Sequence, residues 1–172
     1  MPGFNLADLF ERVADAVPER EVIVSPARRL TFAQLDERAN RLANALHDLG
    51  VGRGDHIGLQ LLNGSEYIEG MLAAFKLGAV PINVNFRYVE GELRHLYDDA
   101  DLVAVIHHQQ FSPRVGAVAP QAEKIRHLIV VGDSSGAAVA TGAVDYEAAI
   151  AAASPARPDG QARSGYDRYL AY

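Results

Sequence analysis

Two adjacent histidines, His107 and His108, are the first residues that could bind a metal ion. They end the apolar run LVAVIHH, at residues 102–108. Neighbouring residues on a strand point to opposite faces of the sheet, so these two side chains cannot hold one metal ion side by side. The remaining histidines stand alone in the sequence: His47, His56, His95 and His127. A lone histidine is more often a surface or core residue than a ligand, so we predict no metal site.

Two other stretches could bind ions. The acidic cluster DDAD (98–101) ends a predicted helix and is more typical of a solvated turn than of a cation site. The stretch GVGRGD (50–55) is glycine-rich, but a phosphate-binding loop follows a strand and opens a helix, whereas this one follows a helix and precedes a strand. We therefore predict a helix stop and a turn there. The sequence contains no G-x-S-x-G elbow, Walker loop or Rossmann fingerprint, and we name no catalytic residue.

Composition narrows the class of protein. The 172 residues are 49% apolar and 22% charged, which predicts one globular domain or one lobe of a larger protein. The net charge of -6 argues against a nucleic-acid partner, because phosphate binding needs clustered basic residues. No cysteine is present, which excludes disulfides and fits a reducing compartment. No apolar run approaches the roughly 18 residues of a membrane span, and the first residues lack a signal-peptide pattern. We expect a cytoplasmic protein.

The fold class follows from the alternation of helix and strand patterns. The clearest helix, TFAQLDERANRLANALHDLG (31–50), has a capping box between Thr31 and Gln34 and a glycine stop at Gly50. Amphipathic helices are also predicted at 5–17, 63–78, 89–100 and 145–153. Apolar strands are predicted at 21–25, 56–62, 79–84, 102–108 and 126–132. Continuous apolar strands between helices indicate an α/β fold with a parallel sheet that is covered on both faces.

Three stretches together resemble the amino-terminal end of the adenylate-forming enzymes, which include acyl-CoA synthetases, luciferases and the adenylation domains of peptide synthetases. They are residues 30–59, residues 76–93 and the closing DRYLAY (167–172). The stretch NVNFRYVEGELRHLYDDADLVAVI is most similar to the branch of acyl-CoA synthetases and fatty-acid–CoA ligases. The resemblance implies layered helices around a mainly parallel sheet, as in the amino-terminal subdomain of that family's large lobe.

The resemblance also implies a division of the chain and a chemistry. We expect a subdomain at 1–153, a linker at 154–166, and at 167–172 the start of the strand that leads into the family's phosphate-binding loop. In the complete enzymes a fatty or other carboxylic acid reacts with Mg-ATP to give an acyl-adenylate, and coenzyme A (CoA) then displaces AMP. The family's ATP-binding segments match positions beyond Tyr172, so we expect the fragment alone to be inactive and to bind none of ATP, Mg²⁺ and CoA.

One residue of this chain receives a role from the resemblance. Arg87, in the sequence NFR, takes the place of an arginine that contacts the nucleotide phosphate of CoA in some acyl-CoA ligases. A guanidinium suits a phosphate because its charge is permanent and its donors are forked. The alternative is an arginine that only fixes the loop after its strand.

Two functional interpretations stay open. The first is an enzyme fragment, whose sheet would have an unpaired edge, so that the isolated piece would be marginally stable, dimeric or held by a partner chain. The second is a freestanding binding or regulatory module that kept only this lobe. Pyrophosphate exchange with ATP separates the two interpretations.

Overall fold

The computed structural model describes residues 4–25, 28–159 and 163–171. Positions 1–3 and 26–27 of the predicted subdomain lie outside the described residues. So do positions 160–162 of the predicted linker and position 172 of the predicted strand start. The helices are α1 (Leu6–Ala16), α2 (Phe32–Asp48), α3 (Ser65–Leu77), α4 (Glu90–Asp99), α5 (Ser112–Val118) and α6 (Tyr146–Ala152). The strands are β1 (Glu21–Val24), β2 (Arg29–Thr31), β3 (His56–Gln60), β4 (Val80–Asn83), β5 (Leu102–His108), β6 (His127–Val131), β7 (Val144–Asp145) and β8 (Leu170–Ala171).

The predicted parallel sheet is confirmed. Six strands of the described chain pair in the order β7-β6-β5-β3-β4-β8, and each neighbouring pair is parallel. Six of the seven residues of β5 are buried, which explains why this strand is apolar throughout rather than alternating. β1 and β2 stand apart from this sheet as an antiparallel hairpin.

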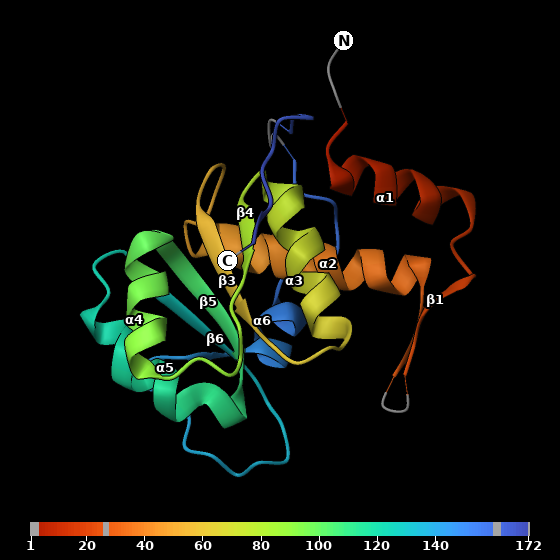
Figure 1. The fold of residues 1–172 in the computed structure, drawn as a ribbon. Helices are drawn as coiled ribbons and strands as arrows, with labels where there is room; N and C mark the ends of the chain where they lie inside the picture. The colour runs from red at the N-terminus through yellow and green to blue at the C-terminus, as the bar shows by residue number, and fades with distance from the viewer. Residues whose placement is uncertain (1–3, 26–27, 160–162, 172) are drawn as a thin grey trace.

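Helices cover both faces of the sheet, as predicted (Figure 1). On one face α2, α3 and α6 share a core with Ile57 and Leu59 of β3 and Ile106 of β5. On the other face α4 and α5 pack around Ile82 of β4 and Val105 of β5. The molecule is therefore a three-layered α/β unit, built by burial of two separate apolar clusters.

The predicted helix ends are confirmed at several positions. The Thr31 side chain accepts a hydrogen bond from the Gln34 backbone, and the Gln34 side chain accepts one from the Thr31 backbone, which completes the capping box. Gly50 has a φ of 83° after α2, the left-handed conformation that glycine adopts without strain. The stretch GVGRGD thus joins α2 to β3 as a turn, as its position in the sequence predicts.

Helix α1 packs differently from what its apolar stripe suggests. Leu6, Leu9 and Val13 share one face of this helix, but they are 53%, 48% and 44% exposed. The buried residues of α1 are Ala7 and Ala14, and Phe10 packs against a small cluster with α2. Small residues bring α1 close to its neighbours, and polar contacts hold the helix there.

The closing strand is β8, which pairs with β4 through Ile82–Leu170 and Asn83–Ala171. Its strand conformation covers two of the residues 167–172 for which a strand start is predicted. Of the predicted linker, residues 154–156 lie against α2, where the Asn40 and Asn44 side chains donate to their carbonyls. The division of the chain at 153 and 166 stays a prediction.

Candidate functional site

The carboxyl ends of the parallel strands meet at one edge of the sheet, which we call the carboxyl edge. The connection from β3 leads to β4 on one side, whereas the connection from β5 leads to β6 on the other side. Loops therefore diverge between β3 and β5, the arrangement at which open α/β sheets usually bind ligands. The loop after β4 and the end of β8 lie at the same edge, because β4 and β8 are parallel neighbours.

Arg87 belongs to the loop that follows β4 at the carboxyl edge. The Asn85 side chain accepts a hydrogen bond from the Arg87 backbone at 3.0 Å, and the Tyr88 backbone donates to the Asn85 carbonyl at 3.0 Å. These bonds form a tight turn that directs Arg87 outward. Its side chain is exposed, and its guanidinium carbon lies 5.6 Å from the centre of the Phe86 ring. Among the described residues no carboxylate lies within 4 Å of it. The loop thus presents an exposed cation, over the Phe86 ring, to solvent.

Arg114 fixes this loop, and sequence reasoning missed it. Its Nη1 donates to the Tyr88 carbonyl at 2.6 Å and lies 3.5 Å from the Phe86 carbonyl. Phe86 also stacks on Phe111, with ring centres 6.0 Å apart. In the sequence Arg114 lies in a weak helix pattern, SPRVG, which gives no sign of a contact with a loop 26 residues earlier. The described contacts that hold the loop therefore come from Asn85, Phe111 and Arg114, and the side chain of Arg87 contributes only its position over the Phe86 ring.

A hollow begins beside this loop. It has a volume of about 230 Å³ and is lined by Tyr88, Glu92, His95 and Leu96. Its walls come from the loop and from one face of α4, and they bring together a phenol ring, an imidazole and the Glu92 carboxylate, with Arg87 preceding Tyr88 in the chain. Rings and a cation together suit a ligand that carries both a flat ring and an anionic group.

The two histidines point to opposite faces of β5 and have different partners, as predicted. The His107 Nε2 lies 2.7 Å from the Ser112 hydroxyl, and the His108 Nδ1 accepts a hydrogen bond from the Leu62 backbone. Burial lowers the pKa of His107 to about 4, against a smaller opposing effect of the Val105 carbonyl. His107 is therefore neutral near pH 7.

A buried polar group lies beside His107 at the point where the loops diverge. Gln60 pairs in register with His107, and Tyr97 donates to its Oε1 at 3.1 Å. The Gln60 Nε2 and the His107 Nδ1 have no hydrogen-bond partner in the described part of the chain. Both side chains are fully buried, so neither is exposed at the surface of the described chain.

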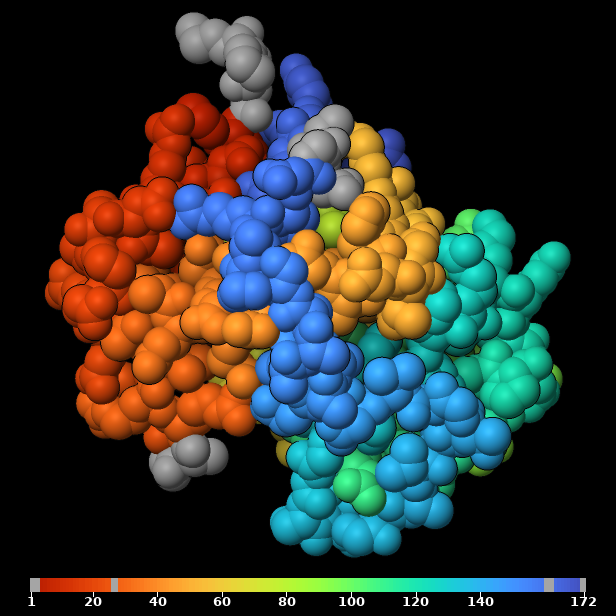
Figure 2. Space-filling view, turned by 180° about the vertical axis from the view of Figure 1, so that it is seen from behind, coloured from red at the N-terminus to blue at the C-terminus, as the bar shows by residue number. Residues whose placement is uncertain are grey.

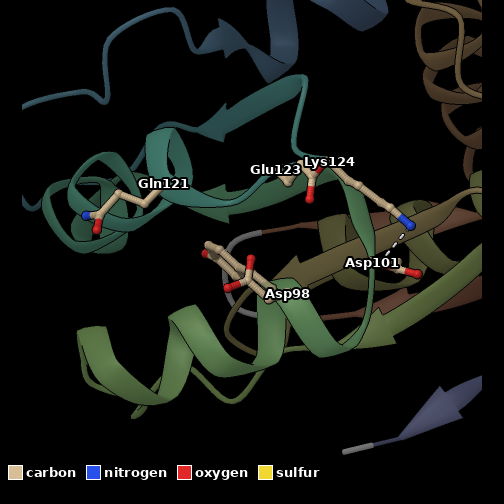
Figure 3. Close-up of a pocket in the computed structure, with 6 residues that line it drawn as sticks. Asp98, Asp101, Gln121, Glu123 and Lys124 are labelled. Carbon is tan, nitrogen blue, oxygen red and sulfur yellow. Dashed lines mark ion pairs between the residues drawn. The ribbon is translucent and has the colours of Figure 1, made fainter.

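The acidic cluster lies at the opposite edge of the sheet. Asp98 and Asp101 line a hollow of about 230 Å³ together with Tyr97, Gln121, Glu123 and Lys124. Figure 3 shows Lys124 reaching across to Asp101, at a distance of 2.9 Å. Within the described ranges no three His, Asp or Glu side chains are grouped so that they could hold a metal ion. The cluster is thus partly neutralised by a lysine, and it is remote from the carboxyl edge.

None of the helices in the described part of the chain is both long enough and apolar enough to span a bilayer.

Comparison with known proteins gives a consistent result. The family model described as AMP-binding enzyme matches residues 10–163. A 3-oxocholest-4-en-26-oate–CoA ligase of Rhodococcus rhodochrous is 45% identical over 99% of this chain, which covers 31% of that ligase. The medium-chain acyl-CoA ligase Mig of Mycobacterium avium is 40% identical, with 99% of this chain and 33% of the ligase covered.

Solved structures agree with these relatives. A Mycobacterium tuberculosis fatty acyl CoA synthetase matches 98% of this chain and 32% of its own, with a TM-score of 0.84 and 26% identity. The amino-terminal domain of FACL13 from the same organism matches 96% of this chain, with a TM-score of 0.82 and 26% identity. The chain thus spans about a third of the length of the curated relatives that it matches.

Proposed function

Because this chain belongs to the AMP-binding enzyme family, we propose that it is the amino-terminal part of an AMP-forming acyl-CoA ligase. The observation that supports this most directly is the 45% identity to CoA ligases over 99% of the chain. The proposed reaction has two steps. A carboxylate oxygen attacks the α-phosphorus of ATP and releases pyrophosphate, and the sulfur of CoA then attacks the acyl carbon and releases AMP.

The proposed substrate is a medium- or long-chain apolar carboxylic acid. The names of the relatives include medium-chain and long-chain fatty acids and 3-oxocholest-4-en-26-oate, which is also an apolar carboxylate. Because ATP and CoA are the co-substrates, the proposed site of action is the cytoplasm.

The 172 residues alone are proposed to be inactive. Stabilisation of the transferred phosphate needs backbone donors, a cation and Mg²⁺ around the phosphates. Among the described residues no three His, Asp or Glu side chains are grouped so that they could hold a metal ion together. We therefore derive no step through ATP or Mg²⁺ on this chain, and we assign their binding to the part of the relatives that this chain does not span.

Arg87 is the residue of this chain for which we propose a ligand contact, with the nucleotide phosphate of CoA. Three observations support it. The guanidinium is exposed and has no carboxylate within 4 Å among the described residues. Arg114 already fixes the loop, so the charge of Arg87 is available to a ligand. The hollow lined by Tyr88, Glu92, His95 and Leu96 opens at the same loop, since Tyr88 follows Arg87 in the chain.

Pyrophosphate exchange tests the proposed function. We expect a polypeptide of the relatives' full length, encoded by the same gene, to catalyse ATP–pyrophosphate exchange that depends on a long-chain acid. We expect no exchange by the 172-residue chain. Exchange by the 172 residues alone would contradict the assignment of ATP binding. Absence of exchange in a full-length polypeptide, or a gene that encodes only this lobe, would favour the freestanding module.

The role of Arg87 has its own test. In the full-length polypeptide Arg87→Ala should raise the KM for CoA about tenfold, the loss expected for one charge-assisted contact of about 1.4 kcal/mol. Pyrophosphate exchange should be unchanged, because adenylate formation precedes CoA binding. Arg94→Ala is the matched control, because it also removes an exposed arginine, but one that lies on α4 and not in the loop after β4. An unaltered KM for CoA in Arg87→Ala would refute the contact.

A further inference from the structure

The segment that follows α6 is held on α2 by polar contacts. Figure 2 shows residues after α6, in blue, lying across α2, in orange. The side chains of Asn40, Arg41 and Asn44 donate to backbone carbonyls of this segment at 2.8–3.1 Å. The accepting residues are Ala153, Ser154, Pro155 and Ala156. One face of α2 thus holds the extended chain through its backbone.

Lys76 lies under this segment, at the end of α3, and is fully buried. Its Nζ donates to the Glu11 carboxylate of α1 at 2.5 Å and to the Asp36 carboxylate of α2 at 2.7 Å. Burial of an ammonium group costs free energy unless the group is paired, so these two carboxylates are needed to keep Lys76 charged and buried between the helices. Lys76 therefore links three helices through charge.

The same two carboxylates also bind Arg157 and Arg163 of the closing segment, by which we mean the part of the chain after α6, described at residues 153–159 and 163–171. The second oxygen of Glu11 accepts from Arg163 at 2.8 Å, and the second oxygen of Asp36 accepts from Arg157 at 3.0 Å. Arg163 further donates from its Nε to the Lys76 carbonyl at 3.2 Å. Each carboxylate thus bridges the buried lysine to an arginine that lies more than 80 residues later in the chain. We call Glu11, Asp36, Lys76, Arg157 and Arg163 the ionic clasp.

A second set of contacts continues from the clasp to β8. The Asp167 carboxylate accepts hydrogen bonds from the Asn5 side chain at 3.1 Å, from Arg53 at 2.8 Å and from the Ser164 backbone at 2.7 Å. After it, the described residues of β8, Leu170 and Ala171, pair with Ile82 and Asn83 of β4. Of the β8 side chains, Leu170 reaches the apolar core and is partly buried there.

We propose that Lys76, Glu11 and Arg163 are positioning residues. Their charges hold β8 in place beside β4, and they therefore set the position at which the chain leaves the carboxyl edge. For catalysis this inference rests on the proposed function, in which that exit leads to the phosphate-binding part of the ligase. In this proposal the clasp acts through β8 and not by contact with a substrate.

Hydrogen exchange of the 172-residue chain, read by mass spectrometry, tests the positioning directly. In Glu11→Gln, which keeps the shape of the side chain, amides of residues 163–171 should exchange about tenfold faster than in the wild type. Amides of β5 should exchange at the wild-type rate. Arg29→Gln is the matched control, because it removes an arginine from a close pair with Glu21 far from β8. Equal exchange of residues 163–171 in Glu11→Gln and the wild type would overturn the proposal.

A double-mutant cycle separates charge coupling from simple loss of contact. If Glu11 couples the two cations, Lys76→Met and Arg163→Gln should together speed exchange by less than the product of their single effects. Independent, multiplying effects would contradict the coupling. Arg163→Lys should give an exchange rate between those of the wild type and Arg163→Gln, because lysine keeps the charge but loses the bond to the Lys76 carbonyl. If Lys76→Met does not fold, the comparison of the wild type with Glu11→Gln and Arg163→Gln decides.

The catalytic consequence is measured in the full-length polypeptide. Glu11→Gln should lower kcat for pyrophosphate exchange about tenfold and leave the KM for CoA unaltered. An unchanged kcat, with faster exchange at β8, would refute the catalytic part of the inference. A wild-type full-length polypeptide that lacks pyrophosphate exchange would refute the proposed function, whereas the hydrogen-exchange comparison would still decide the positioning.

Discussion

Strand β5 and the closing segment, whose described residues are 153–159 and 163–171, are held in place by different forces. β5 lies between β3 and β6, and residues Leu102 to Ile106 are at most 8% exposed. The closing segment crosses the surface of α2 and is held by side-chain bonds to its carbonyls and by the ionic clasp. Apolar burial fixes the centre of the molecule, and charge fixes its last strand.

This difference has a consequence for how each region responds to change. Loss of a buried methyl group in β5 removes contacts from both neighbouring strands and from a helix layer, so the whole domain loses stability. Loss of one charge in the clasp frees a segment that contributes little to either apolar core, so the effect should remain local. The predictions below test whether the two regions behave in these two ways.

The largest effect should come from the apolar centre. Ile106 is fully buried in the core shared with α2 and α3. Ile106→Ala should lower the free energy of unfolding by about 4 kcal/mol, because it leaves a cavity between packed layers. Urea denaturation measures this as a lower midpoint with an unchanged slope.

Val139→Ala is the control for this prediction, since Val139 is 50% exposed in a loop and its loss should cost less than about 0.5 kcal/mol. Equal destabilisation by both variants would show that the centre is not the main source of stability.

A decrease in pH should produce the next largest loss of stability, again through the buried centre of the sheet, where His107 lies. The pKa of His107 is about 4 in the folded chain because of burial, compared with about 6.5 in an unfolded chain. Between these values the unfolded state binds a proton that the folded state does not, so stability falls as the pH decreases from about 6.5 to 4. The total loss from this group approaches about 3 kcal/mol at pH 4.

Denaturation midpoints between pH 7 and pH 4 measure this loss. Burial also lowers the pKa of His108 and of His127, which act in the same direction. His107→Gln should therefore reduce the slope of stability against pH without abolishing it. An identical slope in His107→Gln would show that His107 is not the main titrating group.

The centre of the fold could be predicted from the sequence because its signals are local. Apolar runs, a capping box at Thr31 and a glycine stop at Gly50 each lie within one element, and the structure confirms them. The position of Arg87 in an exposed turn also follows from local features, since Asn85 closes that turn two residues away. Its proposed CoA contact is a matter of resemblance and stays a prediction.

The clasp could not be predicted in this way because its partners are distant in sequence. Glu11 and Arg163 are 152 residues apart, and no periodicity marks either of them. Lys76 reads as an ordinary last-turn lysine of α3, although it is fully buried. The apolar residues on one face of α1 suggest a buried face, but its leucines remain exposed. The contact of this helix with the closing segment is polar and joins residues that are distant in sequence.

The smallest predicted effect separates local from global stability at the closing segment. Asn44 donates to the Ser154 and Ala156 carbonyls at 2.8 Å each, and both bonds lie near the surface. Asn44→Ala removes them at a local cost of about 1 kcal/mol, while alanine favours the helix by about 0.5 kcal/mol. The urea midpoint should therefore stay nearly constant, whereas amides of residues 154–159 should exchange about fivefold faster. Asn44→Asp, which places a carboxylate against the two carbonyls, should speed this exchange further. If the midpoint fell with the local protection in both variants, the segment would unfold together with the centre, and the distinction between an apolar core and a separately held last strand would be wrong.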